Sequence, residues 1–245
     1  MKTTFGVELE CLIPRSYIGD DSQFNPGGHG RGNQISNAPA GWTVERDGSV
    51  RSTVDGMTGV EVVSPILEGE DGLVQVVAMC DYLTEIGATV NSLCGLHVHV
   101  GAKRLDVAAY TRAFVIYEKA FFASGGEKAK GRFDGTWCKP SSRWDGGRYS
   151  SVNLTNVGRS SKNTVEIRCF SPSLDAGDVI GATLMATSLV MAVRNGTTVT
   201  GSAFETGKEA MVEYVKIMAD PANQIVAIDG TDLEYLVEKA SQSAV

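Results

Sequence analysis

Cysteine and histidine are both scarce in this sequence, and their scarcity excludes several kinds of site. Only five cysteines and three histidines occur among 245 residues. The odd number of cysteines, their wide spacing and the lack of any Cys-x-x-Cys motif argue against a disulfide framework. We expect buried, reduced thiols in a cytoplasmic protein. Three histidines are also too few for multi-zinc chemistry. The cysteines are Cys11, Cys80, Cys94, Cys138 and Cys169.

Long apolar runs are absent as well. The first residues, Met1 to Thr4, lead directly into the alternating segment that begins at Phe5, without an apolar signal stretch. No window approaches the ~18–20 uninterrupted apolar residues that cross a bilayer. The sequence therefore predicts a protein without a membrane partner.

Positive charge is in deficit, with 22 Lys and Arg against 29 Asp and Glu and a formal net charge of −7. Binding to a nucleic-acid backbone needs clustered basic residues, so we expect no nucleic-acid partner. An acidic site that carries magnesium can still bind a nucleotide. The hydrophobic share of 42% is typical of a globular protein. We expect one domain over residues 1–245.

Alternating apolar and polar residues predict the strands, and helical spacing with capping residues predicts the helices. We expect helices over Gly72–Ile86, from Asp106 to about Ala123, over Val179–Arg194 with Asp175 as cap, over Met211–Met218, and from a capping box at Thr231–Glu234. The mixed order favours an α+β fold with a largely antiparallel sheet. The predicted strands are Phe5–Leu12, Gly59–Ser64, Gly95–Val100, Ser151–Leu154 and Thr164–Phe170.

Two long segments carry no strong pattern. Asp20–Gly41 is rich in glycine, and Ser124–Arg148 combines glycines with six basic residues. Structureless stretches of this length in compact domains are commonly lids or binding loops. A solvated insertion is the alternative for each.

The polar faces of the predicted strands carry ionisable pairs. Residues i and i+2 of a strand point to one side, about 6.5–7 Å apart. If the strands form one sheet, their like charges need cations to coexist. Carboxylates with an imidazole suit magnesium or manganese better than zinc, and a nearby arginine suits phosphoryl chemistry. Surface carboxylates on a half-exposed sheet are the alternative. The residues are Glu8 with Glu10, Glu61, His97 with His99, and Glu166 with Arg168.

Other motifs fit less well. Gly201–Glu209 resembles a phosphate loop, but it has five residues between its glycines instead of four, and Glu209 stands where Ser or Thr would hold magnesium. A zinc hydrolase could use the His97-Val-His99 pair, but the third histidine, His29, lies in a glycine-rich loop. Asp47-Gly48-Ser49 reads first as a tight turn, and a functional role for Asp47 stays open.

Five segments in order closely resemble the amidoligase family, a branch of the carboxylate–amine ligases that includes glutamine synthetase and glutamate–cysteine ligase. The resemblance runs from residue 5 to about residue 175 and leaves a helical part over residues 176–245. The segments are Phe5-Gly-Val-Glu8-Leu-Glu10, Trp42 with Asp47-Gly-Ser49, Gly59-Val-Glu61-Val-Val-Ser64-Pro65, Cys94-Gly-Leu-His97-Val-His99-Val, and Ser151-Val-Asn153-Leu with Thr164-Val-Glu166-Ile-Arg168.

This resemblance implies a curved, mainly antiparallel sheet that forms a half-barrel like the glutamine synthetase catalytic domain, with helices on its convex face. It implies ATP and two or three Mg²⁺ ions, with Mn²⁺ as a substitute, on the concave face. The implied reaction activates a carboxylate as an acyl phosphate, which an amine then attacks. The substrates would be small-molecule or peptide/protein amines and carboxylates, and an oligomer is left open.

The resemblance also assigns roles to residues. Arg168 would meet the γ-phosphate, with Glu166 and Asp47 as further catalytic residues. Arg148 and Asn153 would hold phosphate or a substrate carboxylate, and Ser124–Arg148 would close over ATP. A guanidino-kinase type of phosphotransferase and a non-catalytic nucleotide- or metal-binding module remain as alternatives. The implied metal ligands are Glu8, Glu10, Glu61, Glu166 and one or both of His97 and His99.

Overall fold

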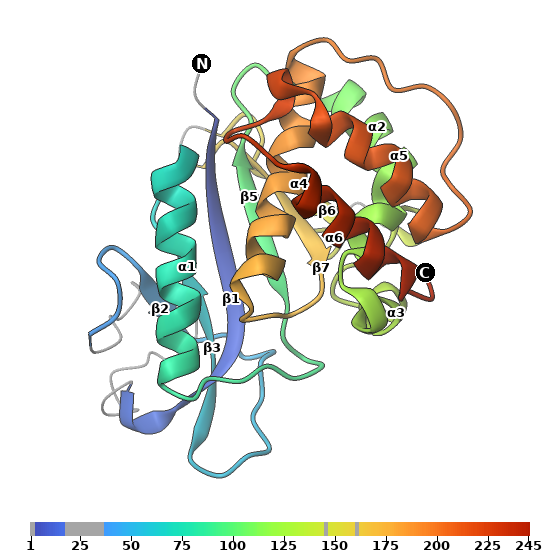
Figure 1. Cartoon of the computed structure of the whole chain (residues 1–245). Helices are drawn as coiled ribbons and strands as arrows, with labels where there is room; N and C mark the ends of the chain where they lie inside the picture. The colour runs from blue at the N-terminus through green and yellow to red at the C-terminus, as the bar shows by residue number, and fades with distance from the viewer. Residues whose placement is uncertain (1–2, 18–36, 145–146, 160–161) are drawn as a thin grey trace.

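A computed structural model describes residues 3–17, 37–144, 147–159 and 162–245. Its described strands form a seven-stranded open sheet in the order β2-β3-β1-β5-β7-β6, with β4 also paired to β1, and every pair of these strands is antiparallel (Figure 1). The predicted α+β class with a mainly antiparallel sheet is confirmed. The strands are β1 Thr4–Pro14, β2 Thr43–Glu45, β3 Met57–Val63, β4 Leu67–Glu68, β5 Leu96–Gly101, β6 Val152–Asn153 and β7 Thr164–Phe170.

One face of the sheet forms the core. Along β1, Phe5, Val7 and Leu9 are buried, and Val7 lies opposite Val98 of β5 in the strand register. The alternate positions of the same strands point to the other face. The period-2 pattern in the sequence therefore separates an apolar face from a polar face.

Six described α-helices accompany the sheet: α1 Gly69–Glu85, α2 Val107–Ala123, α3 Ala129–Asp134, α4 Ala176–Arg194, α5 Gly207–Ala219 and α6 Gly230–Ser241. Figure 1 shows α1 and α4 lying along the sheet, and α4 contacts β1 and β5 directly. Helices α2, α5 and α6 pack beside α4 and against one another. The helical layer thus covers the apolar face.

Helix α4 is the central helix of this layer. It has 19 residues with a mean hydropathy of 1.6, which is enough by length and composition to cross a membrane, and it is the one such helix in the described part of the chain. However, 72% of that stretch is buried inside the domain, against the sheet and neighbouring helices. Its apolar composition is therefore explained by its place in the core.

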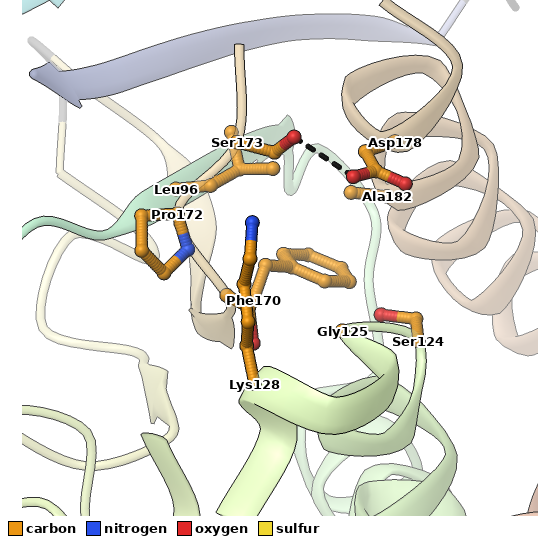
Figure 2. Close-up of a pocket in the computed structure, with 10 residues that line it drawn as sticks. Leu96, Ser124, Gly125, Lys128, Phe170, Pro172, Ser173, Asp178 and Ala182 are labelled. Atoms are coloured by element: carbon orange, nitrogen blue, oxygen red, sulfur yellow. Dashed lines mark hydrogen bonds between the residues drawn. The ribbon is translucent and has the colours of Figure 1, made fainter. Parts of the chain in front are cut away.

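The turn from β7 into α4 is closed by polar contacts. Asp175 caps α4 as predicted, because its side chain accepts a hydrogen bond from the Asp178 N–H at 3.0 Å. Figure 2 shows Ser173 donating to Asp178, at 2.8 Å, beside Phe170 and Lys128. A cavity of about 20 Å³ lies among these side chains, room for about one water molecule.

Helices α5 and α6 both begin earlier than the sequence predicted, at Gly207 and Gly230. The capping box predicted at Thr231 is wrong: Asp229 is the N-cap of α6 and accepts hydrogen bonds from the N–H groups of Thr231 and Asp232, at 2.8 and 3.0 Å. Thr206 and Glu209 form the capping box of α5, so the Gly201–Glu209 segment leads into a helix start.

Within the Ser124–Arg148 segment, the described residues 124–144 are more ordered than predicted. It contains α3 and two short 3-10 helices, at Gly126–Lys128 and Ser141–Arg143. The expectation of a structureless loop is wrong here because tertiary contacts fix the segment. The buried Glu118 carboxylate on α2 accepts a hydrogen bond from the Ser141 N–H at 2.8 Å. Most of the Asp20–Gly41 segment, residues 20–36 including His29, lies outside the described residues.

Candidate functional site

The sheet brings the predicted ionisable pairs onto one face. Glu8 of β1 lies opposite His97 of β5, and Glu10 lies opposite Glu61 of β3. On the other side, His99 lies opposite Glu166 of β7. The prediction that these strands share one sheet is confirmed. The ionisable groups form a row across the strands β3, β1, β5 and β7.

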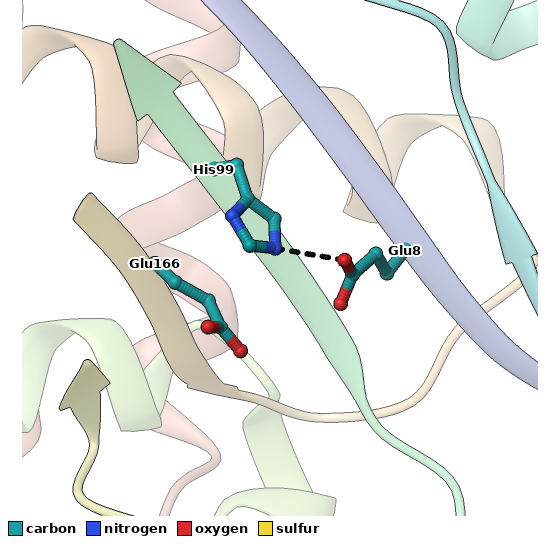
Figure 3. A group of neighbouring side chains, drawn as sticks. All are labelled: Glu8, His99 and Glu166. Carbon is teal, nitrogen blue, oxygen red and sulfur yellow. Dashed lines mark ion pairs between the residues drawn. The ribbon is translucent and has the colours of Figure 1, made fainter. Parts of the chain in front are cut away.

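Glu8 lies at the centre of this row. Its Oε2 atom is 3.3 Å from His97 Nδ1, and its Oε1 atom is 2.9 Å from His99 Nε2. Figure 3 shows Glu8, His99 and Glu166 pointing toward one another from three neighbouring strands. The His99–Glu8 contact is short but is not aligned as a hydrogen bond, so the buried Nε2 atom of His99 has no hydrogen-bond partner among the described residues.

Ligand atoms in this row gather into three overlapping sets. In each set the atoms lie within 4.8 Å of one another. Glu8 belongs to two sets and Glu61 to two, so the sets are continuous. Sets of carboxylate oxygens, with at most one imidazole nitrogen, are ligands that suit magnesium and manganese. The sets are Glu8–His99–Glu166, Glu8–Glu61–His97 and Glu10–Asp47–Glu61.

Burial and crowding shape the charges in the row. Burial raises the pKa of Glu61 to about 10, with the neighbouring charges of Glu8 and Glu10 acting in the same direction. Burial also acts to raise the pKa of Glu8, but the adjacent imidazoles of His97 and His99 outweigh it and lower that pKa well below its ordinary value. A bound cation would relieve the repulsion that Glu61 experiences.

The Glu166–Arg168 pair forms one end of the row. Arg168 Nη1 donates to Glu166 Oε1, and Asn153 Nδ2 donates to Glu166 Oε2 at 2.8 Å. Burial acts to raise the pKa of Glu166, but the Arg168 charge outweighs it and the pKa is lowered. Glu166 is therefore an ionised, oriented carboxylate with a guanidinium beside it.

Asp47 lies beside the row, whereas the contacts described for Arg148 lie elsewhere. The Asp47 Oδ1 atom accepts hydrogen bonds from the Ser49 N–H and Oγ, both at 2.6 Å, so the predicted tight turn is confirmed. The same turn places Asp47 in a set with Glu10 and Glu61. Arg148 is exposed, with its guanidinium carbon 5.5 Å from the centre of the Tyr149 ring. None of the contacts described for Arg148 joins it to the row, and its role stays a prediction.

Two residues near the row were not predicted. Glu45 of β2 lies opposite Glu61 and continues the acidic row by one strand, but a three-residue strand gives almost no periodic signal. Arg132 reaches the row from α3, where its Nη2 atom lies 3.4 Å from His97 Nε2. Only the tertiary structure brings Arg132 to this face, because nothing in the local sequence pairs it with the strands.

A groove of about 330 Å³ begins beside Glu8 and His99, in the middle of the row. Its lining includes Gly6 and Gly101, where a Cβ atom would lie 3.3 Å from Ser64 Oγ and 2.7 Å from Thr4 Oγ1 respectively. Ser64–Ile66 lines one part of it and Lys162–Thr164 another. The groove combines apolar walls with a lysine near the candidate ligands.

Comparison with known proteins identifies the family. A family model described as "Putative amidoligase enzyme" matches residues 2–143, more than half of the 245-residue chain. A comparison with curated proteins gave no match. The match covers Glu8, Glu10, Glu61, His97 and His99. Strands β6 and β7 follow it in sequence, and β7 completes the row by pairing with β5. The chain therefore belongs to the amidoligase family.

Proposed function

We propose that the protein is an ATP- and Mg²⁺-dependent carboxylate–amine ligase. The observation that carries this proposal is the continuous row of carboxylates and imidazoles on one sheet face of an amidoligase-family member. We further propose that this face is the concave side of a half-barrel like that of glutamine synthetase. The free, buried state of all five cysteines is compatible with a cytoplasmic location.

Two or three magnesium ions would occupy the donor sets. The crowded Glu61 carboxylate is a group that a cation would stabilise. Glu8, His99 and Glu166 would hold one ion, and the sets that share Glu61 would hold the others. Bound magnesium would neutralise phosphate charge and so favour phosphoryl transfer.

The groove supports a place for the nucleotide. About 330 Å³ is within the usual range for small-molecule sites. The apolar Pro65 and Ile66 would contact the base, and Lys162 would attract the phosphates toward the Glu8–His99–Glu166 set. Arg168 would face the γ-phosphate from beyond Glu166. Asn153 would act through Glu166, to which its side chain already donates.

The reaction would proceed in two steps. A carboxylate oxygen of the acid attacks the γ-phosphorus, the bond to the β–γ bridging oxygen breaks, and ADP leaves with that electron pair. The amine nitrogen then attacks the acyl carbon of the acyl phosphate, loses a proton, and inorganic phosphate leaves. The sum converts ATP, acid and amine into ADP, phosphate and amide. Arg168 would stabilise the negative charge on the transferring phosphoryl group. Removing a charged donor of this kind typically costs several kcal/mol of transition-state stabilisation, so the rate would fall by about 10²-fold or more.

The test measures ADP release from Mg-ATP with panels of acids and amines, with mass spectrometry of the products. Glu166→Gln and Arg168→Lys keep the volume of the buried pair and should each abolish most ADP release. Arg112→Ala, on the exposed side of α2, should leave it unchanged. Unchanged release in both site variants contradicts the proposal. A phosphorylated product without amide indicates a phosphotransferase, and ATP binding without turnover indicates a binding module.

A further inference from the structure

Arg132 connects α3 to the centre of the row. Its Nη2 atom donates to the Arg168 carbonyl oxygen at 2.7 Å, and its Nη1 atom donates to the Cys94 carbonyl oxygen at 3.4 Å. These two carbonyls belong to β7 and to the residues just before β5. One guanidinium therefore bridges the two strands that carry His97 and Arg168.

The bridge lies at an irregular point of the sheet. Leu96 pairs with Phe170 while Val98 pairs with Ile167, so His97 alone stands opposite Arg168 and Cys169. This is a β-bulge, and bulges next to active sites commonly re-aim a side chain. Two of the three residues at this bulge, His97 and Arg168, belong to the row. Their direction depends on how the bulge is held.

A glycine makes room for the guanidinium. A Cβ atom on Gly95 would lie 2.3 Å from Arg132 Nη2 and 2.9 Å from its Cζ. Any side chain at this position would push the guanidinium away from both carbonyls. The position of the Arg132 guanidinium thus explains why glycine occupies position 95 in the Cys94-Gly-Leu-His97 segment.

Arg132 also contacts the His97 ring. The Arg132 Nη2 atom lies 3.4 Å from His97 Nε2, and Glu10 Oε1 lies 3.6 Å from the same nitrogen. On the other side of the ring, Nδ1 lies 3.3 Å from Glu8 Oε2 and 3.8 Å from Glu61 Oε1. The guanidinium therefore adds a cation beside the ring and, together with the carboxylates, restricts where the ring can lie.

The helix that carries Arg132 is itself fixed. The Phe133 ring packs edge-on against Phe122 of α2, with ring centres 5.0 Å apart. The Cys138 thiol donates to the Arg132 carbonyl oxygen at 3.2 Å. The Arg132 guanidinium therefore extends from a helix, α3, whose position is fixed by these contacts.

We infer that Arg132 is a positioning residue: it closes the β5–β7 bulge and thereby orients His97 and Arg168 for the chemistry of the row. The catalytic part of this inference rests on the proposed function. The bulge is a property of the protein without nucleotide. It can therefore be tested separately from turnover.

The first measurement is amide hydrogen exchange, followed by mass spectrometry, in the protein without nucleotide. Peptides that cover residues 94–98 and 167–171 should exchange faster in Gly95→Ala and Arg132→Lys than in the wild type, because the bulge loses the guanidinium that closes it. Lys130→Ala, on the exposed side of α3, should exchange like the wild type. Equal exchange in Arg132→Lys and the wild type overturns the inference, whether or not the protein is a ligase.

The second measurement separates positioning from binding. Gly95→Ala and Arg132→Lys should lower kcat for ADP release by about 10²-fold, the cost of a misplaced reacting group. KM for ATP should stay within about threefold, because neither residue lines the groove. A rise in KM with unchanged kcat contradicts a positioning role. Absence of turnover in the wild type, with the expected faster exchange in the two bulge variants, rejects the ligase proposal alone.

Discussion

Glu61 is the residue on which the crowding of the row acts most strongly. Its pKa is raised from 4.5 to about 10, first by burial and then by Glu8 and Glu10. The folded protein therefore binds a proton at Glu61 over a pH range where the unfolded chain has lost it. In metal-free protein this group's contribution to stability is complete below about pH 4.5 and declines as the pH rises toward 10.

Replacing Glu61 by Gln should remove that decline. In EDTA, the free energy of unfolding of Glu61→Gln should fall less between pH 5 and 9 than that of the wild type, by at most about 1.4 kcal/mol per pH unit for one proton. Urea unfolding at a series of pH values measures this. Glu85→Gln, an exposed change of the same type on α1, should follow the wild type. Parallel curves for wild type and Glu61→Gln would show that Glu61 is not the crowded group.

At the scale of elements, the ion pair of Asp178 and Lys239 joins α4 to α6. Lys239 Nζ lies 2.5 Å from Asp178 Oδ1, and Ser173 and Tyr235 also donate to this carboxylate. Burial opposes ionisation of both groups, but their contacts lower the pKa of Asp178 and raise that of Lys239. The pair therefore stabilises the fold mainly between the ordinary values of 3.8 and 10.5.

Lys239→Met should lower the free energy of unfolding by about 1–2 kcal/mol at pH 7, between the values for exposed and buried pairs. The difference from wild type should shrink as the pH falls below 3.8, when Asp178 becomes protonated. Lys216→Met, which removes an exposed pair with Glu213 on α5, should cost less than about 0.5 kcal/mol. Equal losses in the two variants would show that the α4–α6 contact has no special weight.

The elements also show what the sequence could and could not predict. Strands β1, β3, β5 and β7 were predictable because each puts apolar side chains on the core face and polar ones on the other, which gives the sequence a period of two. The same period of two puts Glu8, His97 and Glu166 on the polar faces of their strands, whatever the order of those strands in the sheet. The position of Arg132 was not predictable, because it depends on Phe133 packing on Phe122 and on the space at Gly95. Contacts of this kind leave no periodic trace.

At the scale of the whole molecule, the sheet separates two environments. The helical layer covers an apolar face, while the opposite face collects Glu8, Glu10, Glu61 and Glu166. These four carboxylates belong to a chain with a net charge of −7. Because the described cations within contact distance of the row are few, repulsion on this face opposes folding in the absence of metal.

Magnesium should therefore stabilise the whole domain. A ligand that binds only the folded state at 100 times its Kd adds about 2.7 kcal/mol, which corresponds to about 5–10 °C in Tm for a domain of this size. MgCl₂ should raise Tm by this amount over EDTA, while NaCl at equal ionic strength should raise it much less, because screening acts weakly on buried groups. Glu8→Gln removes a carboxylate shared by two donor sets and should lose most of the magnesium effect, whereas Glu85→Gln should retain it. If NaCl reproduces the shift, or Glu8→Gln keeps it, the row does not bind the ion, since screening of surface charge needs no particular carboxylate.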